Sequence, residues 1–427
     1  MKKTLIALAL TALPVAAMAD VVLYGQIKGG VGVTGGASVT STEWDKNTVN
    51  GGSTTAHYKS KDKSGTITQM EDYGSRIGFK GEEDLGNGLK AIWQVEQRVS
   101  LAGAQVSEGW NTRDTFIGLE GGFGKVRAGY VSDQFNENME TMDIWEYRTG
   151  AGAAARGLAT MTRFDGRSQG VRYDSPNFGG FDFNITHQMA DDAAEGVFRN
   201  DNEAKGQSTI VGLNYENSGF FGKVGYGFYK DTAESFDINT RKKTGDKDGH
   251  VARVEAGYDA NNLFVGLAYQ YTKNMPAYAA LHGDTVAGVV ATQLVNDGTY
   301  SNRDAALKAI GGISADKTHE VAVSVAYTMG AITPKLTYAH GWDQKVSMNN
   351  GAATFNGVKV DNSGYDQVII GADYALSKRT TALVSAGWMN SGSTLKSVTT
   401  NSKGQVTGAA FEDDDIYSIG VGVRHKF

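Results

Sequence analysis

Residues 318–329 read Thr-His-Glu-Val-Ala-Val-Ser-Val-Ala-Tyr-Thr-Met, with apolar side chains at every second position from Val321 to Met329. Two further stretches, Leu263–Tyr271 and Tyr417–Phe427, show the same period of two. Successive side chains point to opposite faces of a β-strand, so this period indicates strands that have one apolar face. The sequence therefore predicts an all-β fold.

The segments between the predicted strands come in two sizes. Short segments contain the Gly, Asn and Asp residues that tight turns require, and they lie at 84–88, 121–124, 175–180, 216–219, 259–262, 328–330 and 375–378. Long polar segments alternate with them, at about 34–71, 101–111, 132–166, 190–206, 231–248, 274–316, 343–363 and 391–413. Seven short turns and eight long loops join 16 antiparallel strands, which returns both chain ends to the short-turn side. A helical period is expected only in the short run Glu137–Tyr147.

The first residues, 1–19, predict a secretory signal peptide. Lys2 and Lys3 precede the apolar run Leu5–Leu13, and small residues up to Ala19 favour cleavage before Asp20. The chain contains no Cys, which excludes disulfides, Cys-ligated zinc and thiol nucleophiles. Mean hydropathy is −0.33, and no apolar stretch long enough for a membrane-spanning helix follows the signal peptide.

Tyrosines recur just before the short turns, at Tyr173, Tyr215, Tyr258, Tyr327 and Tyr374. A β-propeller also repeats every 40–45 residues, but these spacings vary from 42 to 69 residues. Aromatic rings at strand ends are typical of a membrane–water interface. Backbone groups in hydrocarbon must pair within the protein, so strands that cross a membrane must close into a barrel. Residues 20–427 are therefore expected to form one domain, a 16-stranded antiparallel transmembrane β-barrel with a water-filled lumen.

Seven stretches carry a family pattern, namely Met1–Leu8, Ala16–Asp20, Val22–Lys28, Ser75–Gln97, Thr115–Arg127, Val171–Phe181 and Val423–Phe427. Through them the chain resembles the trimeric general porins of Gram-negative outer membranes, in particular the neisserial type. The resemblance implies short periplasmic turns, long extracellular loops and a third long loop, about 132–166, that folds into the lumen. It further implies a homotrimer among outer-membrane lipid and lipopolysaccharide. Such a protein passes ions and small hydrophilic solutes by general diffusion and is not an enzyme.

The resemblance also implies that the third loop narrows the lumen and faces basic residues of the wall. The acidic residues of that loop expected at the constriction are Glu137, Glu140, Asp143 and Glu146. The wall residues expected to face them are Lys28, Arg76, Arg98, Arg113 and Arg127. A transverse field between the two groups would orient water and dipolar solutes.

Charged side chains that face lipid near the bilayer midplane cost roughly 2–4 kcal/mol each, so charges within the strands are expected to face the lumen. The basic residues at inward positions are Lys28, Arg76, Lys80, Lys90, Arg98, Arg113, Lys125, Arg127, Arg172, Lys223, Arg253, Lys335 and Arg424. The acidic residues at inward positions are Glu96, Asp182, Glu255, Glu320 and Asp373. Because rings of charge set ion preference, this basic excess predicts a weak preference for anions.

Other classes of function stay open from the residues alone. A solute-selective channel would have the same barrel. It would differ from a general diffusion pore in that its conductance saturates and is blocked by the solute. A barrel hydrolase would need a Ser/His or Asp/His pair converging at one rim, and the loop Tyr278–Ile313 could serve adhesion. No P-loop or HExxH motif is present and the seven His are scattered, so no metal, cofactor or nucleic acid is expected.

Overall fold

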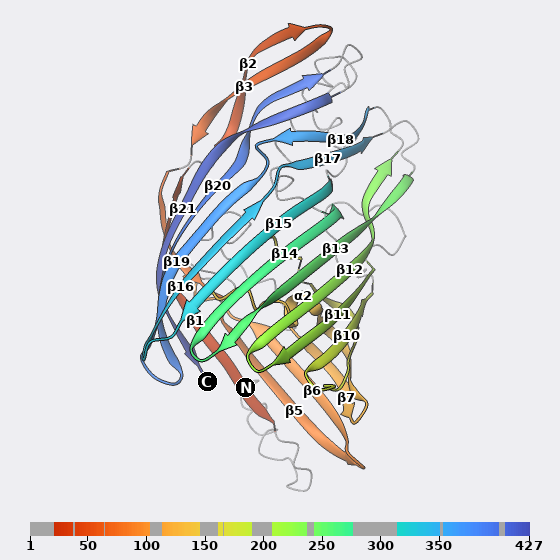
Figure 1. The fold of residues 1–427 in the computed structure, drawn as a ribbon, viewed down its shortest axis with the longest axis vertical. Helices are drawn as coiled ribbons and strands as arrows, with labels where there is room; N and C mark the ends of the chain where they lie inside the picture. Colours follow the sequence, from red (N-terminus) through yellow and green to blue (C-terminus); the bar gives the residue numbers. More distant parts are fainter. Residues whose placement is uncertain are drawn as a thin grey trace, which may run out of the picture.

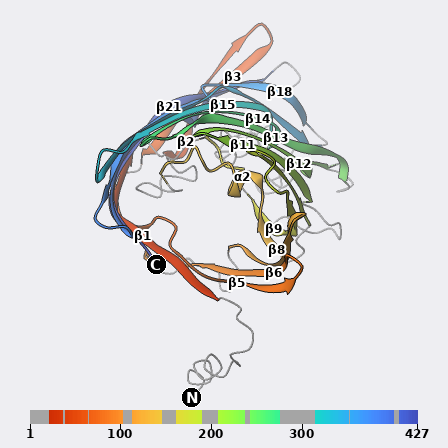
Figure 2. The ribbon, with the colours of Figure 1, turned by 60° about the horizontal axis from the view of Figure 1, so that its bottom comes forward.

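The computed structural model describes residues 21–36, 39–63, 65–102, 113–145, 161–164, 166–189, 207–236, 243–275, 314–350, 353–400 and 406–427. In this part of the chain a single sheet curls into a closed barrel (Figures 1 and 2). The signal peptide expected at 1–19 lies outside the described residues. No helix within the described ranges is long and apolar enough to cross a membrane.

Sixteen strands build the wall in the described chain, with β4 and β5 counted as one strand that is interrupted at residues 73–75. They are β1 (Val22–Gly36), β4 (Ile67–Asp72), β5 (Arg76–Gly86), β6 (Leu89–Arg98), β7 (Thr115–Gly121), β8 (Gly124–Ser132), β9 (Arg167–Asp174), β10 (Phe181–Gln188), β11 (Ser208–Asn217), β12 (Phe220–Phe236), β13 (Lys243–Ala260), β14 (Leu263–Met275), β15 (Ser314–Tyr327), β16 (Ile332–Gly341), β19 (Tyr365–Ala375), β20 (Thr380–Thr400) and β21 (Val406–Lys426). The expected 16-stranded antiparallel barrel is thereby confirmed.

Pairing of the first wall strand with the last closes the barrel. β1 runs antiparallel to β21, and Lys28 lies opposite Arg424 in their register. The other wall strands pair antiparallel with their neighbours along the chain, as β5 does with β6 and β14 with β15. Closure pairs both edges of the described wall strands, as hydrocarbon requires of a sheet that crosses a membrane. The start of β1 and the end of β21 lie on the side of the short turns (Figure 1).

Within the described residues, strands or their hairpins fill much of four segments expected to be long polar loops. The segment 34–71 holds the hairpin of β2 (Val39–Asn50) and β3 (Ser53–Lys63), and 343–363 holds the hairpin of β17 (Gln344–Asn350) and β18 (Ala353–Asp361). In 231–248 and 391–413 the wall strands β12, β13, β20 and β21 simply continue. These extensions project beyond the wall (Figure 1). They lack an apolar face, so apolar alternation could not reveal them.

The helical run expected at Glu137–Tyr147 is wrong. The helix α2 (Gln134–Glu137) spans four residues, with Asp133 as its N-cap and Asn138 as its C-cap. Turns follow as far as residue 145, and the end of the expected run lies outside the described residues. The apolar spacing that suggested a helix has a different cause, which is packing of this segment against the barrel wall.

The outer surface carries an apolar band between two aromatic rims. The exposed rim on the short-turn side comprises Phe178, Phe181, Phe220, Tyr327 and Tyr374. The exposed rim on the long-loop side comprises Tyr226, Tyr269, Tyr338, Trp342, Trp388 and Tyr417. Aliphatic side chains lie between the rims, among them Val224, Val254, Leu267, Val323 and Leu336. This arrangement matches a bilayer, in which aromatic rings occupy the two interfaces.

Candidate functional site

The segment after β8 turns into the barrel, so that α2 lies inside the ring of strands (Figure 2). Asp133 joins the two ends of this loop, because its carboxylate accepts the backbone N–H of Asn136 at 2.9 Å and of Gly166 at 3.1 Å. Asp114, just before β7, fixes the base of the loop. It accepts the N–H of Ser132 at 2.7 Å and pairs with Arg167 at 3.2 Å. The loop is thus tied to both strands that carry it.

Apolar side chains of the loop press into hollows that glycines leave on the inner wall. A Cβ built at Gly225 of β12 would lie 2.7 Å from both Phe135 and Met139. A Cβ at Gly266 of β14 would lie 2.5 Å from the sulfur of Met142. Such approaches are far closer than van der Waals contact, so only glycine admits these three loop residues at their present depth. The three loop side chains are almost completely buried.

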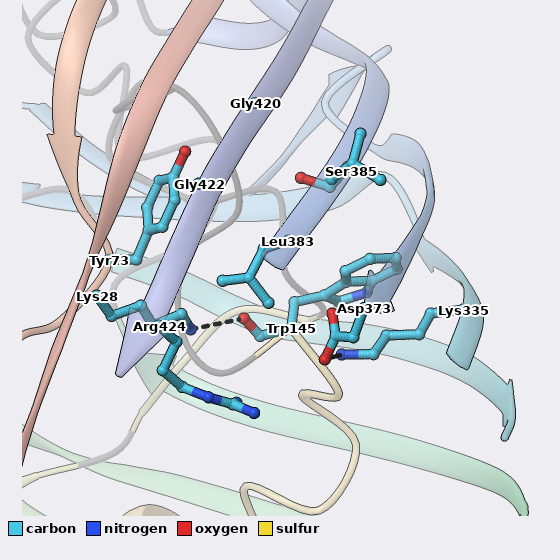
Figure 3. A pocket seen from close by; sticks show the side chains of 11 residues that line it. Lys28, Tyr73, Trp145, Lys335, Asp373, Leu383, Ser385, Gly420, Gly422 and Arg424 are labelled. Carbon is cyan, nitrogen blue, oxygen red and sulfur yellow. Dashed lines mark hydrogen bonds and ion pairs between the residues drawn. The ribbon is translucent and has the colours of Figure 1, made fainter. Parts of the chain in front are cut away.

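Trp145 anchors the far end of the described loop. Its ring packs in a buried cluster of β19, β20 and β21, and its indole N–H donates to Thr337 at 2.9 Å. Two lysines of the wall hold the backbone beside it. Lys28 Nζ donates to the Trp145 carbonyl at 3.3 Å, and Lys335 Nζ donates to the Ile144 carbonyl at 2.8 Å. Figure 3 shows this tip, where both lysines line a small pocket beside the tryptophan.

Near α2, two arginines of the wall share two carboxylates. Arg127 of β8 pairs with Glu137 of the loop at 2.9 Å and with Asp174 of β9 at 2.7 Å. Arg172 of β9 pairs with the same two residues, at 3.2 Å and 2.7 Å. Arg172 is completely buried, so its charge depends on these partners. This cluster connects the start of the loop directly to the charged wall.

A second charged cluster lies on the wall at β5 and β6. Glu96 of β6 pairs with Arg113 and with Arg76 of β5, the latter at 3.7 Å, and accepts the hydroxyl of Tyr24 at 3.0 Å. Burial lowers the pKa of the Arg113 guanidinium, nearby Arg167 lowers it further, and Glu96 raises it again. One carboxylate here serves two arginines, which leaves the cluster positive.

The five basic residues expected at the constriction have different partners. Arg127 contacts the loop acid Glu137, whereas Arg76 and Arg113 pair with a carboxylate of the wall instead. Lys28 reaches the loop but binds a backbone carbonyl. Arg98 lies opposite Arg76 in the register of β5 and β6, which places it on the same inner face.

The acids of the loop are partly neutralised within the loop itself. Arg163, on its returning half, pairs with Glu140 and Asp143 at 2.6 Å each. Of the four acids expected at the constriction, Glu137 contacts a wall arginine in the part of the chain that the structure describes. Glu146 lies outside that part.

Several charged residues were missed at the sequence level. The register places Asp84 and Glu120 opposite Lys90, and Asp174 opposite Lys125, so the number of inward acids exceeds the five expected. The period of two could have found Asp84 and Asp174, which lie four and two residues from the inward charges Lys80 and Arg172 on the same strands, whereas β7 holds no other charge from which Glu120 could be placed. Arg167 and Asp114 lie outside that period, and no sequence signal marked them.

A closed barrel with an apolar outer band, a charged interior and an inward loop defines a class of protein, the water-filled transmembrane channels. A family model described as Gram-negative porin matches residues 45–427, and the chain belongs to this family. It is an outer-membrane β-barrel through which ions and small hydrophilic solutes diffuse.

The relatives and solved structures that the chain resembles agree with this assignment. It is 43% identical over 435 residues to major outer membrane protein P.IB of Neisseria sicca, with 100% of both chains covered. The protein of the same name from Neisseria lactamica is 37% identical over 433 residues, again with 100% of both chains covered. The anion-selective porin from Comamonas acidovorans superposes with a TM-score of 0.61 at 20% identity, over 96% of this chain and 100% of that chain. Salmonella typhi OmpF gives a TM-score of 0.54 at 19% identity, over 96% of this chain and 98% of that chain. These two structures show a shared fold.

Proposed function

We propose that this general diffusion pore prefers anions weakly, and that the preference arises at the constriction between the inward loop and the wall. The observation that supports the proposal is that one carboxylate pairs with more than one basic side chain. Glu96 serves both Arg76 and Arg113. Where one carboxylate faces two guanidinium groups, the local potential is positive and favours anions in the water nearby.

The pocket at the loop tip has the same imbalance. Its described lining contains the cations Lys28, Lys335 and Arg424 and a single carboxylate, Asp373, which Lys335 contacts at 2.6 Å (Figure 3). Beside α2 the charges balance, because two arginines face two acids. Within the loop, acids are in excess, because one arginine pairs with two acids. The net excess is small, which is why we propose a weak preference.

The reversal potential across a KCl gradient tests the proposal in planar bilayers. The wild type should be more permeable to chloride, and Arg76→Glu should shift the potential toward potassium, since Arg76 is a partly exposed member of the Glu96 cluster. Lys378→Glu, in the exposed turn between β19 and β20, is the matched control and should leave the potential unchanged. A wild-type potential that favours potassium contradicts the anion preference. An unshifted Arg76→Glu pore contradicts its location at the constriction.

We further propose that the protein works as a homotrimer among outer-membrane lipid and lipopolysaccharide, after removal of residues 1–19, and catalyses no reaction. Family membership supports the trimer, and the charge and apolar pattern of the first residues supports the cleavage. Native mass spectrometry of the folded protein in detergent should give three times the mass of a chain that begins at Asp20. A monomer, or an intact N-terminus, would refute the corresponding part.

A further inference from the structure

Basic side chains form one continuous row across four strands near their long-loop ends. In the strand registers His250 of β13 lies opposite Lys273 of β14, Lys273 opposite Lys317 of β15, and Lys317 opposite Lys345 of β17. We call these residues the lysine row. Directly opposed residues place their Cβ atoms about 4.5–5.5 Å apart, and like charges there destabilise a sheet. Three lysines in succession are therefore unfavourable unless an anion lies among them.

The lysine row faces outward. Thr272 and Thr318 point into the barrel, where they are buried and hydrogen-bonded to each other at 2.6 Å. Alternation along the strand therefore turns Lys273 and Lys317 to the outer surface. The same holds for Lys345, because the residue before it is completely buried. All three lysines are exposed, and in the described part of the chain none of them has an ion pair or hydrogen bond through its side chain.

The lysine row stands just beyond the aromatic rim of the long-loop side. Tyr271 precedes Lys273 by two residues on β14, and its ring packs against His319 with centroids 5.2 Å apart. Two residues of strand rise roughly 7 Å. Since the aromatic rings mark the membrane–water interface, the lysine ammonium groups lie at the level of the lipid headgroups of the outer leaflet.

A second sector of the barrel carries the opposite charge. Further round, the row that crosses β16, β19, β20 and β21 holds His340, Asp366, Asn390 and Asp415. That row meets β15 at Val321, four residues nearer the short turns than Lys317, and its two carboxylates make the sector acidic. On β13, Asp248 lies two residues beyond the histidine of the lysine row, and one carboxylate offsets only part of three lysine charges. An anionic headgroup is thus attracted to β13–β17 and repelled from β19–β21.

We propose that the lysine row binds the phosphate groups of an anionic lipid of the outer leaflet, whose acyl chains pack on the apolar band below it. This proposal depends on the proposed membrane partners of the protein and not on the ion preference of the pore. Lysine ammonium groups bind phosphate as point charges. Three adjacent strands span about 10 Å, so the row suits a headgroup that carries more than one phosphate.

Binding of diphosphoryl lipid A to the folded protein in detergent tests the site, with native mass spectrometry to count bound lipid. The double variant Lys273→Gln/Lys317→Gln should bind about 30-fold more weakly, because each lysine near an anionic headgroup contributes roughly fivefold in affinity. Lys345→Gln should lower affinity roughly fivefold. It lies in the β17–β18 hairpin outside the wall, so this variant tests the row even if the double variant fails to fold.

The matched control is Lys378→Gln/Arg379→Gln, which removes the same charge from the exposed turn between β19 and β20 and should bind like the wild type. Equal affinity of the lysine-row variants and the wild type, or an equal loss in the control, would overturn the proposal. So would displacement of the lipid by a molar excess of inorganic phosphate, which would mean that the row binds free anions. Single-channel conductance of the lysine-row variants should match the wild type, which separates this site from the pore.

Discussion

Replacing Trp145 with Ala should free the tip of the inward loop while leaving the barrel intact. The tryptophan side chain is 4% exposed and packs in a buried cluster with Ile369, Met389 and Ile416. Its indole N–H also donates to Thr337 at 2.9 Å. The strand ladder that closes the barrel does not involve this side chain, so the substitution acts on the loop alone.

The size of the effect follows from what the side chain buries. Truncation of a buried tryptophan costs about 3–5 kcal/mol, and the hydroxyl of Thr337 also loses its donor. Every 1.4 kcal/mol changes an equilibrium tenfold, so a loss of about 3 kcal/mol multiplies the population of the detached tip more than 100-fold. A detached state too rare to record in the wild type would then be visible.

Single-channel recording in planar bilayers measures this directly. Trp145→Ala should show added conductance substates and greater open-channel noise, together with a weaker selectivity. Trp388→Ala is the control, because that tryptophan is 42% exposed on the outer surface and its loss should leave the current trace unchanged. If Trp145→Ala has the same conductance, noise and reversal potential as the wild type, the reasoning that the tip sets the constriction is refuted.

Three further predictions concern the wall and the base of the loop. Glu96→Gln removes the carboxylate that two arginines share, which adds one net positive charge to the cluster. That charge interacts with an ion roughly 8 Å away by about 0.5 kcal/mol in water. The chloride-to-potassium permeability ratio should therefore rise about two- to fivefold in a salt-gradient measurement. A falling ratio would contradict this. Gly266→Leu should displace Met142 and alter the single-channel conductance. Gly222→Leu should leave the conductance unchanged, because an added Cβ there meets nothing within 4 Å. Equal current traces for both variants would show that the hollow at Gly266 does not affect conductance. Asp114→Asn loses the Arg167 pair at the loop base and should lower stability by about 1–3 kcal/mol in a denaturant titration, and an unchanged midpoint would show that the base is held by other contacts.

The barrel could be predicted from the sequence because the membrane imposes a strict pattern on each strand. Lipid selects an apolar residue at every second position, and the stretch around Val321 and Leu263 shows this without interruption. The pattern ends where the lipid ends. The β2–β3 and β17–β18 hairpins stand beyond the wall, where no face must be apolar, so the sequence pattern predicts loops there.

The candidate site was less predictable, because sequence can tell that a charge faces inward but cannot tell which charge it meets. Arg76 was expected to face an acid of the loop, yet its carboxylate is Glu96 on the adjacent strand. Cross-strand neighbours are set by register, which one sequence without the turn geometry leaves open. Arg163 was not identified as the partner of the loop acids because its pairing depends on the path of the returning loop.

The position of the loop explains why acids and not apolar side chains border the opening. Phe135, Met139, Met142 and Trp145 follow one another at intervals of four, three and three residues, so they share one side of the segment although it is not a helix beyond its first turn. That side is fixed to the glycine hollows of β12 and β14 and to the cluster of β19–β21. The residues between the anchors, Glu137 and Glu140, must then point away from that wall, and their side chains are 36% and 43% exposed. The wall glycines thus determine where the loop acids lie, so a substitution of these glycines should change the ion selectivity of the pore.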